Sequence, residues 1–168
     1  MRILIKNALA VVEHTDTPEL FKTDSNSVLI EGNVISGIGK DIEADVDEVI
    51  DARGMIVYPG LVNTHHHLMQ AFARNIPRAQ NMELFEWLRI VFRVLEKVTP
   101  RFLYDTMLIA GGELMRYGCT AVFDHQYSYP NGQNMELIDA QYRAAKKLGI
   151  RYICGRGGIT RGTENRSE

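Results

Sequence analysis

From residue 60 onward, short apolar runs alternate with longer amphipathic segments. The short runs suit buried strands, and in the longer segments apolar residues recur at the spacing of one helical face. The predicted order is strand, helix, helix, strand, helix, strand, over residues 61–63, 81–98, 100–117, 120–124, 135–148 and 150–154. Strands that alternate with helices are typical of a parallel sheet or barrel. We therefore expect an α/β fold in this part of the chain.

The first part of the chain shows a different pattern, with several short apolar runs separated by turn residues. Within residues 27–39, the pair Gly32-Asn33 separates two apolar runs and predicts a hairpin with a two-residue turn. Residues 15–26 are polar and are expected to form a loop. Several short strands with turns between them indicate a small sandwich or barrel. The predicted domains are therefore an N-terminal β-sandwich portion and an α/β portion, over residues 1–58 and 59–168.

Residue types at the predicted helix ends support these boundaries. Thr99 precedes Pro100, and Thr is a favoured N-cap while Pro is favoured in the first helical turn. Gly118 and Gly149 follow the second and third predicted helices. Gly is the residue most often found just beyond the C-terminus of a helix, so both helices are expected to end there.

Charge and composition exclude several classes of protein. The net charge is −2 and the Lys and Arg residues are scattered, so we expect neither a nucleic-acid-binding surface nor attachment to an anionic membrane. No apolar run approaches the ~20 residues that span a bilayer. The first residues are too interrupted for a signal peptide, and Cys119 and Cys154 are expected to be reduced thiols. The expected location is therefore the cytoplasm.

The strongest local signal is the run from Pro59 to His67, which reads Pro-Gly-Leu-Val-Asn-Thr-His-His-His. Side chains two residues apart on a strand point to the same face, so His65 and His67 are expected to converge while His66 points the other way. Imidazole nitrogens bind zinc and also suit iron. The pair therefore predicts a metal site, and a polar strand end without a metal is the alternative.

Three further side chains are candidates for contact with a substrate. Gln70 carries an amide that donates and accepts at once, as the edge of a purine or pterin requires; the alternative is a solvent-facing loop residue. Trp87 lies among apolar residues at helical spacing, where packing in the core is the alternative. His125 follows the strand predicted at 120–124, at the end where parallel α/β proteins place their sites; a structural histidine is the alternative.

Several motifs together resemble the amidohydrolase superfamily. They follow a small β domain and read Asp51-Ala-Arg-Gly54, Val57-Tyr-Pro-Gly60 and His65-x-His67. Within the superfamily, the sequence most resembles the cytosine and guanine deaminase-like branch, and within that branch the 8-oxoguanine deaminases and hydroxy-triazine aminohydrolases. The narrower resemblance rests on Asn63 to His67 with Gln70, on Leu84 to Leu88, and on Gly118-Cys-Thr120, Asp124-His125 and Gly149-Ile-Arg151.

This resemblance implies a fold and an activity. The fold is a (β/α)8 barrel with a β-sandwich, and the activity is hydrolytic deamination of a ring such as 8-oxoguanine, guanine, a pterin, cytosine or a hydroxy-triazine. One divalent metal, zinc or iron, is held by His65 and His67 with a His and an Asp from later strands, and it activates the attacking water. A Gln at the place of Gln70 contacts the base. A triazine chlorohydrolase is the alternative within the enzyme class.

The length of the chain limits what it can contain. A (β/α)8 barrel needs ~250 residues, and residues 59–168 have room for about three strand–helix units. No histidine follows His125, so the later ligands fall outside this sequence and no catalytic residue is assigned within it. We expect the N-terminal part of an enzyme, an inactive truncated remnant that only associates, or one of two chains that share a site. The expected partners are a small-molecule substrate and either further copies of the chain, as a homo-oligomer, or the missing C-terminal part.

Overall fold

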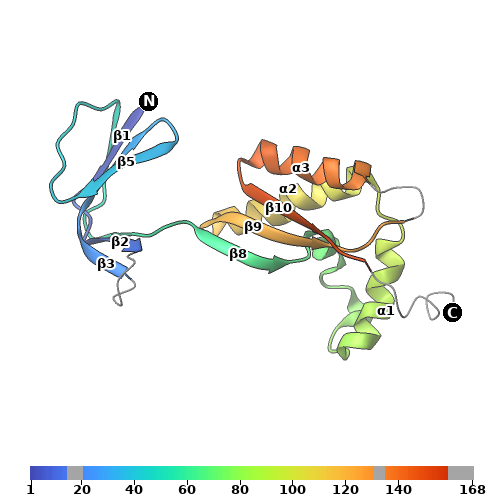
Figure 1. The fold of residues 1–168 in the computed structure, drawn as a ribbon. Helices are drawn as coiled ribbons and strands as arrows, with labels where there is room; N and C mark the ends of the chain where they lie inside the picture. Colours follow the sequence, from blue (N-terminus) through green and yellow to red (C-terminus); the bar gives the residue numbers. More distant parts are fainter. Residues whose placement is uncertain (15–20, 131–134, 159–168) are drawn as a thin grey trace. The chain divides into compact units, whose positions relative to one another are not determined.

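The computed structural model describes residues 1–14, 21–130 and 135–158 (Figure 1). The chain forms two compact units, Met1–Pro59 and Gly60–Glu168. The regular structure described in the first unit consists of strands, whereas the second unit alternates strands and helices. None of the described helices is long and apolar enough to cross a membrane.

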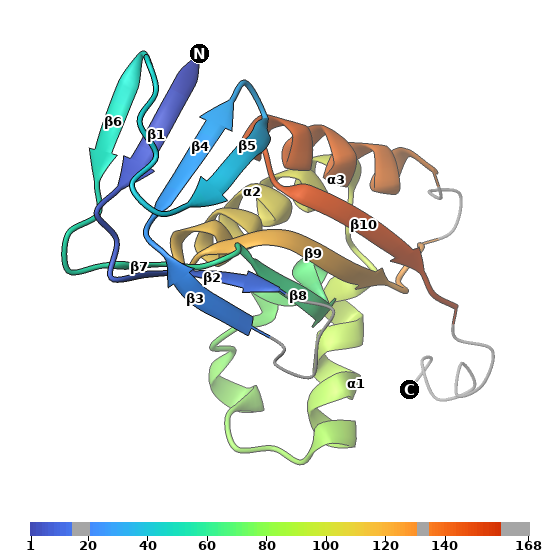
Figure 2. The same ribbon diagram turned by 60° about the vertical axis from the view of Figure 1, so that its left-hand side comes forward.

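The first unit contains two sheets. Its strands are β1 (Arg2–Lys6), β2 (Ala10–His14), β3 (Phe21–Ser25), β4 (Ser27–Glu31), β5 (Val34–Gly39), β6 (Glu48–Asp51) and β7 (Ile56–Val57). One sheet has the order β5-β4-β1-β6, and Figure 2 shows these four strands side by side. The other sheet has the order β3-β2-β7. A small core joins them through the buried side chains of Ala8, Val11, Val28 and Ala52.

One segment of this unit differs from the expectation. The prediction of a loop over residues 15–26 is wrong for Phe21–Ser25, which forms β3 and pairs antiparallel with β2. Backbone pairing defines this strand, and the Ser25 hydroxyl adds a hydrogen bond to Glu13 Oε1 at 2.6 Å across the pair. A short apolar run, the signal used for the other strands, is not needed for such pairing. Residues 15–20 lie outside the described residues.

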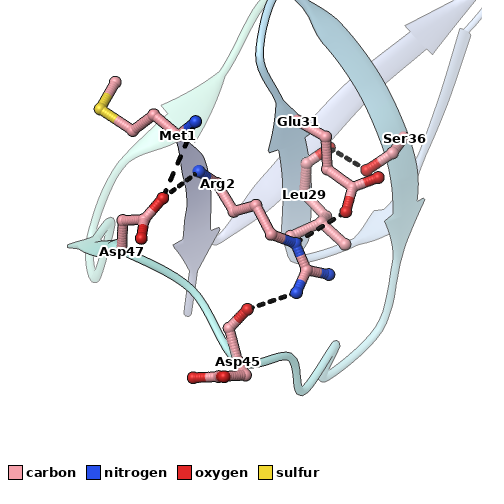
Figure 3. A network of polar contacts seen from close by, with 7 residues as sticks. All are labelled: Met1, Arg2, Leu29, Glu31, Ser36, Asp45 and Asp47. Atoms are coloured by element: carbon pink, nitrogen blue, oxygen red, sulfur yellow. Dashed lines mark hydrogen bonds and ion pairs between the residues drawn. The ribbon is translucent and has the colours of Figure 1, made fainter.

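The predicted hairpin is confirmed. β4 and β5 pair antiparallel around Gly32, whose φ of +63° suits a two-residue hairpin turn. Beside this hairpin, Arg2 Nε donates to Glu31 Oε1 at 2.7 Å, and Arg2 Nη1 donates to the Asp45 carbonyl at 2.6 Å (Figure 3). The Arg2 N–H also donates to Asp47 Oδ2 at 2.6 Å. These contacts hold the irregular segment before β6 against β1, but exposed ion pairs of this kind contribute little to stability.

The second unit has the predicted order of strands and helices. Its elements are β8 (Leu61–His66), η1 (Leu68–Ala73), η2 (Pro77–Ala79), α1 (Leu84–Leu95), α2 (Pro100–Arg116), β9 (Cys119–Gln126), α3 (Met135–Leu148) and β10 (Arg151–Arg156). The strands form a parallel sheet in the order β10-β9-β8. The predictions of three helices and a parallel sheet are confirmed. The two short 3-10 helices, η1 and η2, were not predicted because one or two turns leave no apolar periodicity.

Helices α2 and α3 cover one face of this sheet (Figures 1 and 2). The buried residues between them and the strands are Leu68, Met107, Ala110, Cys119, Val122, Ala144, Ala145 and Ile150. On the other face, Val62 and Ile153 are 65% and 58% exposed. They pair with Ala121 and Phe123 of β9 respectively. The sheet therefore has one helix-covered face and one helix-free face.

The helix ends match the residue types that predicted them. The Thr99 hydroxyl accepts a hydrogen bond from the Phe102 N–H at 3.1 Å, which is an N-cap of α2. Gly118 and Gly149 follow α2 and α3 with φ of +84° and +78°, a backbone conformation that other residues rarely adopt.

Candidate metal site

The sheet changes register at the C-terminal end of β8. Asn63 pairs with Val122 of β9, but His66 pairs with Asp124, so three steps along β8 match two along β9. Val122 and Asp124 are both buried, so Asn63 and His66 share the helix-covered face and the bulge turns His65 toward the helix-free face. The Asn63 side chain accepts a hydrogen bond from the His65 N–H at 3.1 Å, which stabilises this bulge.

The rings of His65 and His67 meet beyond this bulge. Their Nε2 atoms are 3.3 Å apart, and the two ring planes lie at 88° to each other. Two nitrogens that bind one tetrahedral zinc ion at roughly 2.0–2.1 Å are themselves about 3.3–3.4 Å apart, so the spacing of this pair fits such an ion. The prediction that the two rings converge is confirmed, while their role as metal ligands stays a prediction.

A backbone carbonyl selects the tautomer of the His67 ring. His67 Nδ1 lies 2.9 Å from the carbonyl oxygen of His125 on β9. A carbonyl oxygen only accepts, so His67 Nδ1 is the donor in this contact and its Nε2 carries the free lone pair. This is the tautomer that a metal bound at Nε2 needs.

The ring of His125 lies beside the pair. Its centroid is 4.6 Å from that of His65 and 5.7 Å from that of His67. Nevertheless, the described residues contain no group of three or more His, Cys, Asp or Glu side chains that could hold a metal ion. The described part of the chain therefore supplies a pair of imidazole donors, and a role for His125 in substrate contact is untested.

His66 turns to the opposite side, as predicted. Its Nδ1 is buried and has no hydrogen-bond partner among the described residues. Burial lowers the pKa of His66, against the opposing effect of the nearby Asp124 charge. Asp124 is fully buried, and burial raises the pKa of its carboxyl group although hydrogen bonds from Leu68 and Tyr152 act in the other direction.

Two cavities adjoin His67, and Gln70 and Trp87 line both. One has a volume of about 560 Å³ and is also lined by His65. The other, of about 460 Å³, is mainly apolar and is also lined by Leu84, Leu88, Phe92 and Tyr127. Gln70 Nε2 donates to the Tyr127 hydroxyl, which orients the amide.

Trp87 and Gln70, the two candidate substrate residues that line both cavities, already have contacts within the protein. Trp87 is half-buried and packs against a core that contains Met69 and Val91. Part of its side chain therefore serves core packing, which was the alternative to substrate contact. Gln70 is half-buried too, and its amide nitrogen already has a partner in Tyr127. Contact of either residue with a substrate stays a prediction.

Sequence reasoning missed two residues of this region. Tyr127, the partner of Gln70, had no motif to mark it. Asp124 was noted only as part of a motif, yet its position directly after the apolar run Ala121-Val-Phe123 is a signal, because a charged residue at the buried end of a strand needs partners.

These features define an α/β protein that presents a histidine pair suited to a divalent metal at the end of a parallel strand. Residues 56–168 match the amidohydrolase family, and the chain belongs to that family. It is 37% identical over 145 residues to the hydroxydechloroatrazine ethylaminohydrolase of Pseudomonas sp. strain ADP, an alignment that covers 79% of this chain and 30% of that protein. It is 32% identical over 166 residues to the 8-oxoguanine deaminase of Pseudomonas aeruginosa, covering 98% and 36%.

A solved structure of a related enzyme is also similar to this chain. The structure of an atrazine chlorohydrolase from Arthrobacter aurescens TC1 complexed with zinc matches 98% of this chain with a TM-score of 0.86 and 31% identity. That match covers 37% of the chlorohydrolase chain. The present chain thus spans about a third of the length of the relatives that it matches.

Proposed function

We propose that this chain is the N-terminal part of a metal-dependent amidohydrolase that deaminates a nucleobase-like ring by hydrolysis. The observation that carries the proposal is the 3.3 Å separation of His65 Nε2 and His67 Nε2, with His67 Nδ1 held by a backbone carbonyl. A divalent metal, zinc or iron, would lower the pKa of a bound water toward ~7 and so supply a nucleophile at neutral pH. The family membership and the deaminases among the relatives support this reaction class.

The side chains around His67 would bind and orient the ring. Gln70 would hold a polar edge of the substrate, because its amide borders both cavities and is oriented by Tyr127. Trp87 would offer a flat apolar surface, which suits stacking against a planar ring. His125 would contact the substrate beside His65, to which its ring is already close.

We also infer that β8, β9 and β10 are the first three strands of a (β/α)8 barrel. On that arrangement the helix-free face of the sheet is the barrel interior, which accounts for exposed apolar residues such as Val62 and Ile153. Residues 1–58 would then be a portion of a β-sandwich domain and residues 59–168 the start of the barrel. The remaining ligands would come from later strands. A cytoplasmic location and self-association stay predictions.

Metal binding tests the site directly. We expect His65→Ala and His67→Ala each to weaken Zn²⁺ binding to the intact protein, meaning a full-length protein that contains this chain, by at least about a hundredfold, because each removes one of few ligands. His66→Gln is the matched control, since that ring turns away from the pair, and its Zn²⁺ affinity should stay within about threefold of the wild type. Equal affinity in all four proteins would contradict the assignment of His65 and His67.

Ammonia release tests the reaction. The metal-loaded intact protein should be assayed on guanine, 8-oxoguanine, isoxanthopterin, cytosine and hydroxy-triazines, and at least one ring amine should be hydrolysed. A second candidate, removal of chloride from a triazine, is favoured by the likeness to the atrazine chlorohydrolase structure. A matched pair of amino- and chloro-triazines distinguishes the two reactions, because deamination releases ammonia and dechlorination releases chloride. Turnover of neither class would reject the proposed function.

A further inference from the structure

Asp124 lies behind the histidine pair, on the helix-covered face of β9. Its side chain is 0% exposed, so both carboxyl oxygens depend on partners within the protein. Oδ1 accepts a hydrogen bond from the backbone N–H of Leu68 at 2.8 Å. Oδ2 accepts from Gln141 Nε2 of α3 at 2.8 Å and from the Tyr152 hydroxyl of β10 at 2.9 Å. One buried carboxyl group therefore connects β9 to three other elements.

The Leu68 contact acts on the residue that follows His67. At His67 the chain leaves β8 and enters η1, with φ of −130° and ψ of 74°, a conformation that belongs to neither a helix nor a strand. Without a partner the Leu68 N–H would be a buried, unsatisfied donor, so the Asp124 carboxyl group stabilises this turn of the chain. The next residue of β9, His125, holds the His67 ring through its carbonyl oxygen. Two consecutive residues of β9 thus hold the His67 ring and the backbone N–H of the residue that follows it.

We propose that Asp124 is a positioning residue, which holds His67 in place for metal binding by anchoring the Leu68 N–H. The inference rests on the proposed metal site. Gln141 and Tyr152 hydrogen-bond the other oxygen, Oδ2, and so satisfy the half of the buried carboxyl group that does not face Leu68. Groups behind metal ligands typically change metal affinity 10–100-fold when they are removed.

The test compares two variants of the intact protein by equilibrium Co²⁺ binding and by the visible spectrum of the bound Co²⁺. Asp124→Ala removes both carboxyl oxygens, so the buried Leu68 N–H loses its acceptor. We expect it to lower Co²⁺ affinity 10–100-fold and to change the spectrum. Tyr152→Phe is the matched control, because it removes one hydrogen bond to Asp124 and leaves the Leu68 contact intact. It should lower the unfolding temperature while changing Co²⁺ affinity by less than about threefold.

Asp124→Asn tests the geometry as the conservative variant. The Gln141 amide can turn so that its oxygen, which has no hydrogen-bond partner among the described residues, accepts from the new amide nitrogen. The new amide oxygen is then free to accept from the Leu68 N–H, and we expect Co²⁺ affinity within about fivefold of the wild type. An Asp124→Asn protein that binds Co²⁺ as weakly as Asp124→Ala would contradict the anchoring role.

The outcomes separate this inference from the proposed function. If His67→Ala abolishes Co²⁺ binding but Asp124→Ala binds as the wild type does, only the positioning role is overturned. If His67→Ala is also unaffected, the metal site itself is wrong. Should Asp124→Ala not fold, nuclear magnetic resonance of the unmutated metal-free protein provides the test. The inference requires the Nδ1–H tautomer of His67 and slow exchange of the Leu68 amide proton. An Nε2–H tautomer or a rapidly exchanging Leu68 amide would overturn it.

Discussion

The pKa of Tyr129 differs between the folded and the unfolded chain. Burial raises the pKa of its phenol to about 12, and its hydroxyl donates to the Gln126 carbonyl at 3.0 Å. The neutral phenol is favoured in the folded state, so its contribution to stability is complete below the unfolded pKa of ~10 and is lost as the pH rises toward about 12.

We therefore expect the unfolding free energy of the wild type to fall more steeply above pH ~10 than that of Tyr129→Phe, which has no phenol to ionise there. Urea denaturation of both proteins at pH 9, 10 and 11 measures the difference. Parallel pH profiles would show that Tyr129 ionises equally in the folded and unfolded chains.

Part of the site could be predicted at the level of single residues. The alternation of a strand was enough to place His65 and His67 together, because the rule has to hold only over two residues. The same rule places Asn63 on their face, and there it fails, since the bulge puts Asn63 with His66. The contact of Asp124 with Leu68 joins residues 56 positions apart, and no local pattern carries such information.

At the scale of the element, the N-cap of α2 offers a direct test. The Thr99 hydroxyl accepts from the Phe102 N–H at 3.1 Å, so Thr99→Ala leaves one donor of the first turn without a side-chain partner. We expect a loss of about 1 kcal/mol in unfolding free energy, measured by urea denaturation. Thr99→Ser keeps the hydroxyl and should stay within a few tenths of a kcal/mol of the wild type. Equal losses in both variants would show that the methyl group, rather than the cap, is responsible.

Strand β10 approaches β9 closely at Gly155. A Cβ atom built on Gly155 would lie 2.7 Å from the Phe123 ring, which itself packs against His125 at a centroid distance of 4.7 Å. We expect Gly155→Ala to displace this ring and to lower the unfolding free energy by about 1–3 kcal/mol.

The matched control for this variant is Gly158→Ala. Among the described residues, a Cβ atom at Gly158 meets nothing within 4 Å, so its replacement should change stability by less than about 0.5 kcal/mol. Thermal or urea unfolding of both variants and of the wild type measures these changes in unfolding free energy. An unchanged Gly155→Ala protein would mean that Phe123 has room to move.

Elements with a strong periodic signal were predicted well, and elements held by pairing alone were not. The apolar stripes of α1 and α3 predicted both helices, and the capping residues placed both ends of α2. β3 was missed because its strand character comes from its pairing with β2, which a window of sequence does not contain. Short elements such as η1 depend on tertiary contacts in the same way. Leu68 and Met69 of η1 are buried in two different core clusters.

At the scale of the whole molecule, ligand counting predicts the behaviour of the isolated chain. A catalytic zinc site typically has three protein ligands and a position for water, whereas the described residues provide one pair of converging imidazoles. We expect the 168-residue polypeptide, expressed by itself and supplied with zinc or iron, to release ammonia at less than about a tenth of the rate of a complete relative. The assay uses the ring substrates named above. Turnover within tenfold of that relative would mean that association of chains completes the site.

The two crossovers between the parallel strands differ greatly in what they carry. The chain runs through residues 67–118 between β8 and β9, but only through 127–150 between β9 and β10. Gln70, Arg74 and Trp87, which line the larger cavity beside the histidines, all belong to the first crossover. On the proposed function, differences in ring selectivity would therefore lie mainly within one continuous stretch that begins directly after His67. Residues 68–118 would be the segment to exchange between relatives when a different substrate preference is sought, because the exchange leaves His65 and His67 in place.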